Sequence, residues 1–159
     1  KTNQVEADMI AAMVERIFRQ VDHFDDSATV GVIVPYRNQI ATVRNAIDRY
    51  GIPALHSITI DTVERFQGSQ RDYIIYGLTV QQRYQLNFLT DNVFEEDGTL
   101  IDRKLNVAMT RARKHLTIVG NPDILAGSAV YRRLMDFMKS RGCYFNVACE
   151  KFCAGDFSV

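Results

Sequence analysis

The sequence predicts an α/β fold, with a mainly parallel sheet that carries helices on both faces. Short apolar runs rich in β-branched residues alternate with longer segments in which apolar residues recur at helical spacing. The apolar runs are continuous, as in strands that are covered on both sides, and alternation of strand and helix is typical of a parallel sheet. At 159 residues with 47% apolar side chains, the chain suits one domain, residues 1–159.

Two helices and two strands are expected in the first part of the chain. Thr2 or Asn3 can cap a helix, and apolar residues at helical spacing predict this helix over Gln4–Gln20. The run 29–34 is typical of a buried strand, which Pro35 ends before a second helix begins. A further strand is expected at 57–61.

The second part of the chain is expected to continue this alternation around one irregular segment. Residues 81–101 have no clear periodicity and carry Asn, Asp, Glu and Gly, so we expect a long loop there. The tail, 143–159, is expected to form either an edge strand at 144–148 or a connector. The other expected elements are a strand at 73–80, a helix at 102–113, a strand at 116–119, a short helix near Asp123 and a helix through Tyr131 that ends near Gly142.

Composition argues against several classes of protein. The net charge is zero, so composition gives no support for a nucleic-acid partner. Support for such a partner has to come from local clustering of arginine. Cys143, Cys149 and Cys153 match neither a zinc pattern nor a disulfide framework, so we expect reduced thiols and no metal site. The sequence has no signal peptide and no apolar run long enough to cross a bilayer, and we expect a cytoplasmic protein without a membrane partner.

Residues 102–113, Asp-Arg-Lys-Leu-Asn-Val-Ala-Met-Thr-Arg-Ala-Arg, carry the strongest functional pattern. At about 100° per residue, Arg103, Asn106 and Thr110 fall on one face of a helix, with Arg111 at its edge. An arginine held beside a buried strand suits charge stabilisation on a transferring phosphoryl group, because its guanidinium stays ionised and presents a fork of donors. A solvated basic helix is the alternative that the spacing leaves open.

Two further segments carry polar residues that follow predicted strands. Residues 35–39 lie at the carboxyl end of a strand, where open α/β sheets bind ligands. In the segment 62–72, Gly68 lacks a Cβ atom, which lets the backbone come close to a phosphate. From the residues alone, Tyr36 could equally pack on the sheet edge, and 62–72 could be a turn between core strands.

Together these segments resemble the motifs of superfamily 1 helicases in the Upf-like branch. Residues 103–113 are similar to motif VI of that family, 62–72 to motif V, and 35–39 to its Pro-Tyr-x-x-Gln motif. The resemblance covers 3–125 and implies a RecA-like P-loop NTPase fold, in the form of the second motor domain. Residues 92–101 are an insertion relative to the family pattern.

The resemblance implies a role for each motif residue, at the nucleotide, at the nucleic acid or between the two. The nucleotide group is Arg111 as the arginine finger, Gly68 at the terminal phosphate, and Gln70, where the family has Glu. The nucleic-acid group is Pro35, Tyr36, Gln39, Thr62 and Arg65. The group that couples the two sites is Gln67, Arg103 and Asn106.

The resemblance also implies a cofactor and partners: ATP with Mg²⁺ bound between two RecA-like domains, and single-stranded DNA or RNA. The chain begins with Lys1 and has no Gly-x-x-x-x-Gly-Lys-Ser/Thr loop, so we expect a C-terminal fragment of a larger protein whose first motor domain lies upstream. We expect an ATP-dependent helicase in the intact protein and no ATPase activity in this chain alone. Because the family has Glu at the position of Gln70, the alternative of an inactive RecA-like scaffold of a nuclease or recombination protein stays open. The lack of a Gly-x-Gly-x-x-Gly run disfavours dinucleotide binding.

Overall fold

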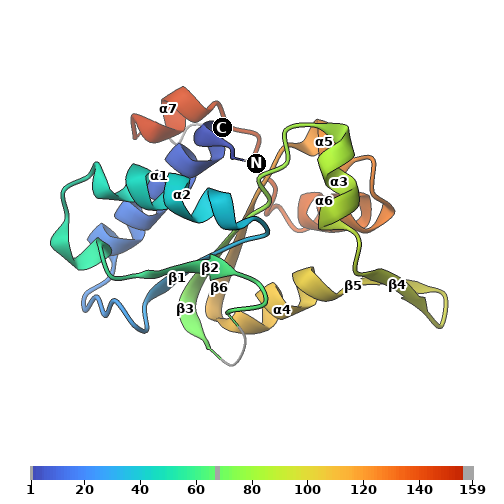
Figure 1. Ribbon diagram of the computed structural model, residues 1–159, viewed down its shortest axis with the longest axis horizontal. Coiled ribbons are helices and arrows are strands. Elements are labelled where there is room, and N and C mark those ends of the chain that lie inside the picture. Colours follow the sequence, from blue (N-terminus) through green and yellow to red (C-terminus); the bar gives the residue numbers. More distant parts are fainter. Residues whose placement is uncertain (1, 67–68, 156–159) are drawn as a thin grey trace.

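A four-stranded parallel sheet forms the centre of the computed structural model, which describes residues 2–66 and 69–155 (Figure 1). Neighbouring strands are parallel throughout this sheet. The carboxyl ends of its strands therefore lie along one edge of the sheet, and the amino ends lie along the opposite edge. In spatial order the strands are β2 (Thr59–Thr62), β1 (Val30–Val34), β3 (Arg71–Gly77) and β6 (Ala112–Val119).

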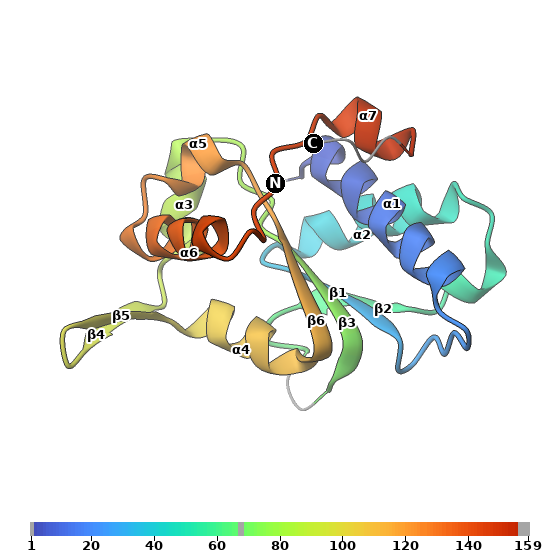
Figure 2. The same ribbon diagram turned by 180° about the vertical axis from the view of Figure 1, so that it is seen from behind.

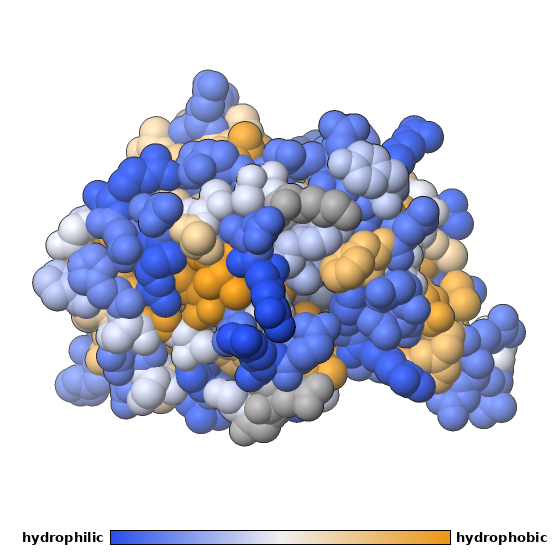
Figure 3. Space-filling model, in the orientation of Figure 1, coloured by the Kyte–Doolittle hydropathy of each residue, from blue (hydrophilic) through white to orange (hydrophobic). Residues whose placement is uncertain are grey.

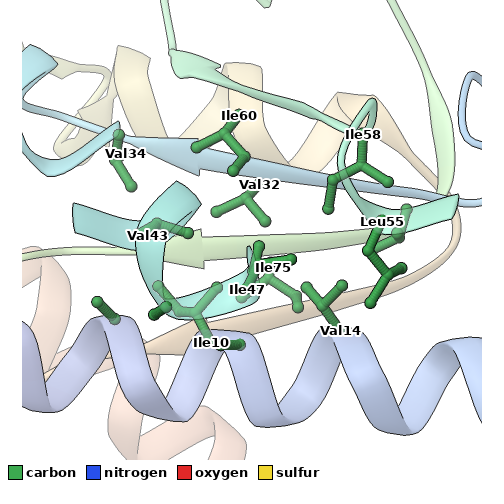
Figure 4. Close-up of a cluster of buried hydrophobic side chains, with 14 of the residues drawn as sticks. Ile10, Val14, Val32, Val34, Val43, Ile47, Leu55, Ile58, Ile60 and Ile75 are labelled. Atoms are coloured by element: carbon green, nitrogen blue, oxygen red, sulfur yellow. The ribbon is translucent and has the colours of Figure 1, made fainter. Parts of the chain in front are cut away.

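Two helices, α1 (Gln4–Gln20) and α2 (Arg37–Asp48), cover one face of the sheet (Figure 2). The bounds of α1 are those that the sequence predicts, because the Asn3 side chain accepts a hydrogen bond from the Glu6 backbone N–H at 3.0 Å. A short 3₁₀ helix, Pro53–Leu55, leads from α2 to β2. Apolar side chains of both helices and of the strands point toward one another in this core, among them Ile10, Val14, Val32, Val43, Ile47 and Ile75 (Figure 4).

The opposite face of the sheet carries a second core. Alternate residues of the same strands, such as Ile33 and Ile74, point to this side and are fully buried. The prediction of a mainly parallel α/β sheet with helices on both faces is therefore confirmed. The helices of this second layer are α3 (Arg83–Leu89), α4 (Arg103–Arg111), α5 (Pro122–Leu125) and α6 (Ala129–Ser140).

The expectation of a long loop at 81–101 was wrong. The segment contains α3 and then a hairpin of β4 (Val93–Glu96) and β5 (Thr99–Asp102), which extends away from the body of the domain (Figures 1 and 2). Asp97 and Gly98 have φ values of 50° and 76°, as a tight two-residue hairpin turn requires. The family insertion at 92–101 is thus an ordered hairpin that leads directly into α4.

The tail forms no edge strand at 144–148; instead it ends in a short helix, α7 (Cys149–Cys153), which packs against α1. All three cysteines are free, and the sulfur atoms of Cys149 and Cys153 lie 3.6 Å apart. Among the described residues, no helix is long and apolar enough to cross a membrane.

Candidate nucleotide and nucleic-acid sites

Arg111 is the last residue of α4 and stands at the amino edge of the sheet. The next residue, Ala112, is paired with Arg71 at the start of β3. The Arg111 side chain is half-buried, and its Nε atom is shielded from solvent with no hydrogen-bond partner in the described part of the chain. It forms no ion pair with any residue in 2–66 or 69–155. Because a partly desolvated cation gains from an anionic partner, this guanidinium suits an anionic ligand supplied from outside the described chain.

The orientation of α4 is fixed at its first turn by Asp102. One carboxylate oxygen of Asp102 accepts a hydrogen bond from the Leu105 backbone N–H at 3.0 Å, as an N-cap does. The other oxygen is buried in the neighbourhood of the Tyr76 and Tyr131 hydroxyls. Burial raises the pKa of Asp102 and of both tyrosines, so this carboxyl group is less acidic than an exposed aspartate.

The exposed face of α4 is the one that the helical spacing predicts. Arg103, Asn106 and Thr110 are exposed, whereas Leu105 and Ala108 are buried against the sheet. The Arg103 guanidinium lies over the Phe94 ring of the hairpin, with 4.7 Å to the ring centroid. This contact links the insertion to the helix that carries Arg111.

Lys104 has a structural role that the sequence did not reveal. It is almost fully buried, with its Nζ atom 3.1 Å from an Asp91 carboxylate oxygen and donating to the Phe88 carbonyl at 3.2 Å. The same ammonium lies 4.2 Å from the centroid of the Phe88 ring. Lys104 therefore joins α4 to the end of α3. The sequence gave no signal of this role, because nothing in a run of basic residues shows that one of them is buried.

The end of the 62–72 segment reaches α4. The side-chain amide of Gln70 donates a hydrogen bond to the Thr110 carbonyl, at 3.1 Å, directly beside Arg111. Two of the nucleotide and coupling residues expected from the sequence, Gln67 and Gly68, lie outside the described residues. At the amino edge of the sheet, the structure thus brings Gln70, near the end of the 62–72 segment, against Thr110, near the end of α4.

Arg71 anchors the same segment from the other side. Its Nη1 atom donates to the Ser69 hydroxyl at 2.6 Å and to the Gln70 carbonyl at 2.8 Å, and its Nη2 atom donates to the Thr59 hydroxyl at 3.0 Å. The guanidinium lies 5.5 Å from the centroid of the Phe66 ring, and burial lowers its pKa. Sequence reasoning assigned Arg71 no role, because its contact with Thr59 depends on how β2 and β3 are placed in the sheet.

At the carboxyl edge of the sheet, several residues expected to contact nucleic acid are engaged inside the protein. Gln39 is fully buried: its side-chain amide donates to the Asn3 carbonyl and its oxygen accepts from the Asn3 N–H, both at 2.8 Å. Tyr36 is 9% exposed and its hydroxyl donates to the Gln85 carbonyl at 3.1 Å. Gln39 therefore ties α2 to the cap of α1, and its side chain is not available to a ligand.

Few of the residues expected to contact nucleic acid have exposed side chains at this edge. Pro35 and Thr62 are buried, whereas Arg65 is exposed. Hydrophilic residues cover most of the face seen in Figure 3, with smaller apolar areas between them. A polar, charged partner suits such a face better than a large apolar one.

The geometry defines a class of protein. A parallel α/β sheet with helices on both faces is consistent with a RecA-like domain of a helicase. Its amino edge carries a half-buried arginine without an ion pair among the described residues, and an exposed arginine follows the carboxyl end of β2.

Comparisons with known proteins identify the family. A family model described as "AAA domain" matches residues 1–123. "Helicase sen1" of Schizosaccharomyces pombe is 32% identical over 141 residues, which cover 87% of this chain and 8% of that protein. "Helicase SEN1" of Saccharomyces cerevisiae is 31% identical over 154 residues, covering 95% and 6%. A "Regulator of nonsense transcripts 1 homolog" of Drosophila melanogaster is 36% identical over 118 residues, covering 70% and 9%.

The chain belongs to this AAA domain family, within the Upf1-like superfamily 1 helicases, and the resemblance drawn from its motifs is confirmed. It spans 6% to 9% of the length of these three relatives. Those relatives therefore carry much sequence that has no counterpart in this chain.

Proposed function

We propose that this chain is the second RecA-like motor domain of an ATP-dependent superfamily 1 helicase, and that Arg111 is its arginine finger. The observation that carries the proposal is the state of Arg111: half-buried, without an ion pair among the described residues, and beside the contact between Gln70 and Thr110. The relatives are named as helicases, which supports the same class of activity. ATP would bind between this domain and the first motor domain of the intact protein.

On the nucleotide side, charge explains how ATP closes the two domains. Arg111 and the Gly68 backbone amide would be attracted to the terminal phosphate, and this attraction would weaken when the phosphate is cleaved and released. The Gln70 side chain contacts the Thr110 carbonyl, beside Arg111. Arg111 also stabilises the negative charge that spreads over the transferring phosphoryl group. Mg²⁺ would be held with ATP by acidic residues of the first domain.

On the nucleic-acid side, Arg65 is the contact that we propose with most support, because it is exposed beyond the carboxyl end of β2. Thr62, Pro35 and Tyr36 lie at the same edge and would contribute backbone groups or the margins of their side chains. We leave Gln39 out, since Asn3 engages both ends of its amide. The strand would be single-stranded DNA or RNA.

The coupling residues would connect these edges. Arg103 and Asn106 are exposed on α4, where they can meet the first domain or the nucleotide, and Gln67 belongs to the segment that leads from β2 to β3. Closing and opening of the domains with each ATP would then move the gripped strand by one step.

The test is to change Arg111 to alanine and to lysine in the intact protein. We expect Arg111→Ala to lower the ATP turnover number about a thousandfold while the Kd for a single strand stays within about threefold. Arg111→Lys should recover part of the turnover, because it restores the charge without the planar fork. Arg132→Ala, on the exposed face of α6, is the matched control.

Equal loss of hydrolysis and strand binding would contradict the finger assignment. The alternative of an inactive RecA-like scaffold, which Gln70 left open, is not favoured, because the relatives are named as helicases; an intact protein without ATPase activity would support it.

A further inference from the structure

The Gln70 side chain holds the end of the 62–72 segment against α4. The Gln70 amide donates to the Thr110 carbonyl at 3.1 Å. Thr110 lies in the last turn of α4, where backbone carbonyls have no partner within the helix. A glutamate at position 70 has no hydrogen to donate and would bring a carboxylate oxygen against a carbonyl oxygen.

The backbone of Gln70 is fixed as firmly as its side chain. Its carbonyl accepts a hydrogen bond from Arg71 at 2.8 Å, and the same guanidinium donates to Thr59 of β2 at 3.0 Å. Arg71 is 9% exposed and lies against the Phe66 ring. Because a planar guanidinium presents several donors in a rigid fork, one side chain can hold both β2 and the 69–71 segment.

These contacts form a continuous path across the domain, which we call the Arg71–Gln70 clasp. It begins at Thr59 of β2, passes through Arg71 and Gln70, and ends at the carbonyl of Thr110. At its start, β2 runs on to Thr62 at the carboxyl edge of the sheet. At its end, Arg111 follows Thr110 directly.

We propose that Arg71 and Gln70 are positioning residues that couple nucleic-acid binding to ATP hydrolysis. A strand bound at the carboxyl end of β2 shifts or rigidifies β2, and the clasp transmits this change to the last turn of α4, which aims Arg111. The inference rests on the proposed function, and it assigns to Gln70 a role within the protein in place of a contact to the nucleotide. A path of hydrogen bonds can carry such coupling only if breaking it uncouples the sites, and this is open to measurement.

The experiment uses the intact protein with the substitutions Gln70→Glu and Arg71→Lys. Gln70→Glu keeps the shape of the side chain and removes the donor, and Arg71→Lys keeps the charge and removes the fork. For each variant, ATP turnover is measured without nucleic acid and at saturating oligothymidylate or oligouridylate, together with the KM for ATP. Gln20→Glu is the matched control, since it makes the same chemical change at an exposed position at the end of α1.

We expect the stimulation of turnover by the single strand to fall at least about fivefold in both variants, as the loss of one or two hydrogen bonds allows. The KM for ATP should stay within about twofold, because the clasp does not touch the nucleotide. A purely structural role would lower the melting temperature and leave the stimulation ratio unchanged. Since Gln70 is exposed, Gln70→Glu gives a folded variant even where Arg71→Lys is unstable.

Unchanged stimulation in Gln70→Glu would overturn the proposal. A raised KM for ATP with normal stimulation would overturn it too, because it would indicate that Gln70 contacts the nucleotide. If the unmodified protein shows no stimulation and Arg111→Ala has no effect, the proposed function itself fails and the clasp falls with it. If Arg111→Ala abolishes stimulated turnover while both clasp variants match the unmodified protein, the clasp alone is refuted.

Discussion

Glu6 is a carboxyl group that the fold keeps away from water, and its replacement by glutamine tests the energetics of α1. It lies in the first turn of α1, where the helix dipole favours an anion, and its Oε1 atom accepts a hydrogen bond from the Thr79 N–H at 2.7 Å. Burial outweighs both effects and raises the pKa of Glu6 to about 8, whereas the bond from Thr79 lowers it. The carboxyl group is therefore protonated in the folded protein at neutral pH.

The sign of the pH dependence of stability follows from the pKa of Glu6 in the folded and unfolded states. In the unfolded chain the carboxyl group has its ordinary pKa of 4.5, so between pH 4.5 and about 8 the folded state holds a proton that the unfolded state has lost. The contribution to stability is complete below pH 4.5 and is lost as the pH rises toward 8. The folding equilibrium constant falls about tenfold per pH unit in this window, or about 3 kcal/mol between pH 5 and pH 7.

Urea unfolding of the purified chain, followed by far-ultraviolet circular dichroism at pH 5, 6, 7 and 8, measures this contribution. Because glutamine does not titrate, the stability of Glu6→Gln relative to the unmodified chain should increase by about 3 kcal/mol from pH 5 to pH 7. Glu64→Gln, which makes the same chemical change at an exposed position, is the matched control. Parallel profiles for Glu6→Gln and the unmodified chain would refute the reasoning, since they would require an ionised Glu6 in the folded state.

Three further predictions concern the chain and its sheet. The isolated chain should show no ATPase activity above background in a phosphate-release assay, because its sequence has no phosphate loop. Gly31→Ala should destabilise the chain by about 1–3 kcal/mol in urea unfolding, because the added Cβ would lie 2.5 Å from the Phe66 ring; stability within error of the unmodified chain would contradict this. Asp102→Ala should cost about 1–2 kcal/mol in the same assay and Asp102→Asn less than half of that, because asparagine keeps the cap of α4.

Elements with local signals were predictable from the sequence. The helix at Gln4–Gln20 has a cap at Asn3 and a regular apolar stripe, and both are readable within a few residues. The hairpin at 93–102 also had a signal, since Asp97-Gly98 is a favoured hairpin turn between two runs that contain Val, Phe, Leu and Ile. It was missed because the acidic residues Glu95 and Glu96 obscured the strand pattern.

The candidate site was predictable only in part. Arg111 and its neighbours follow from a contiguous motif, and the face of α4 follows from helical spacing. The burial of Gln39 and Tyr36 does not, because their hydrogen-bond partners lie 36 and 49 residues away in the chain. The same holds for Arg71, whose bond to Thr59 depends on how two strands are placed in the sheet.

The order of the strands gives Gly31 its importance, because β1 lies between β2 and β3. Residues 63–66 follow β2 at the carboxyl edge of the sheet, and residues 69–70 precede β3 at the amino edge. The buried ring of Phe66 lies over Gly31 of β1. A side chain larger than hydrogen at position 31 would push the ring away, and with it Arg71, whose Cγ atom would lie 3.0 Å from the new Cβ. The space above Gly31 thus accommodates both Phe66, which follows the edge proposed for nucleic acid, and Arg71, which begins β3 at the edge that carries Arg111.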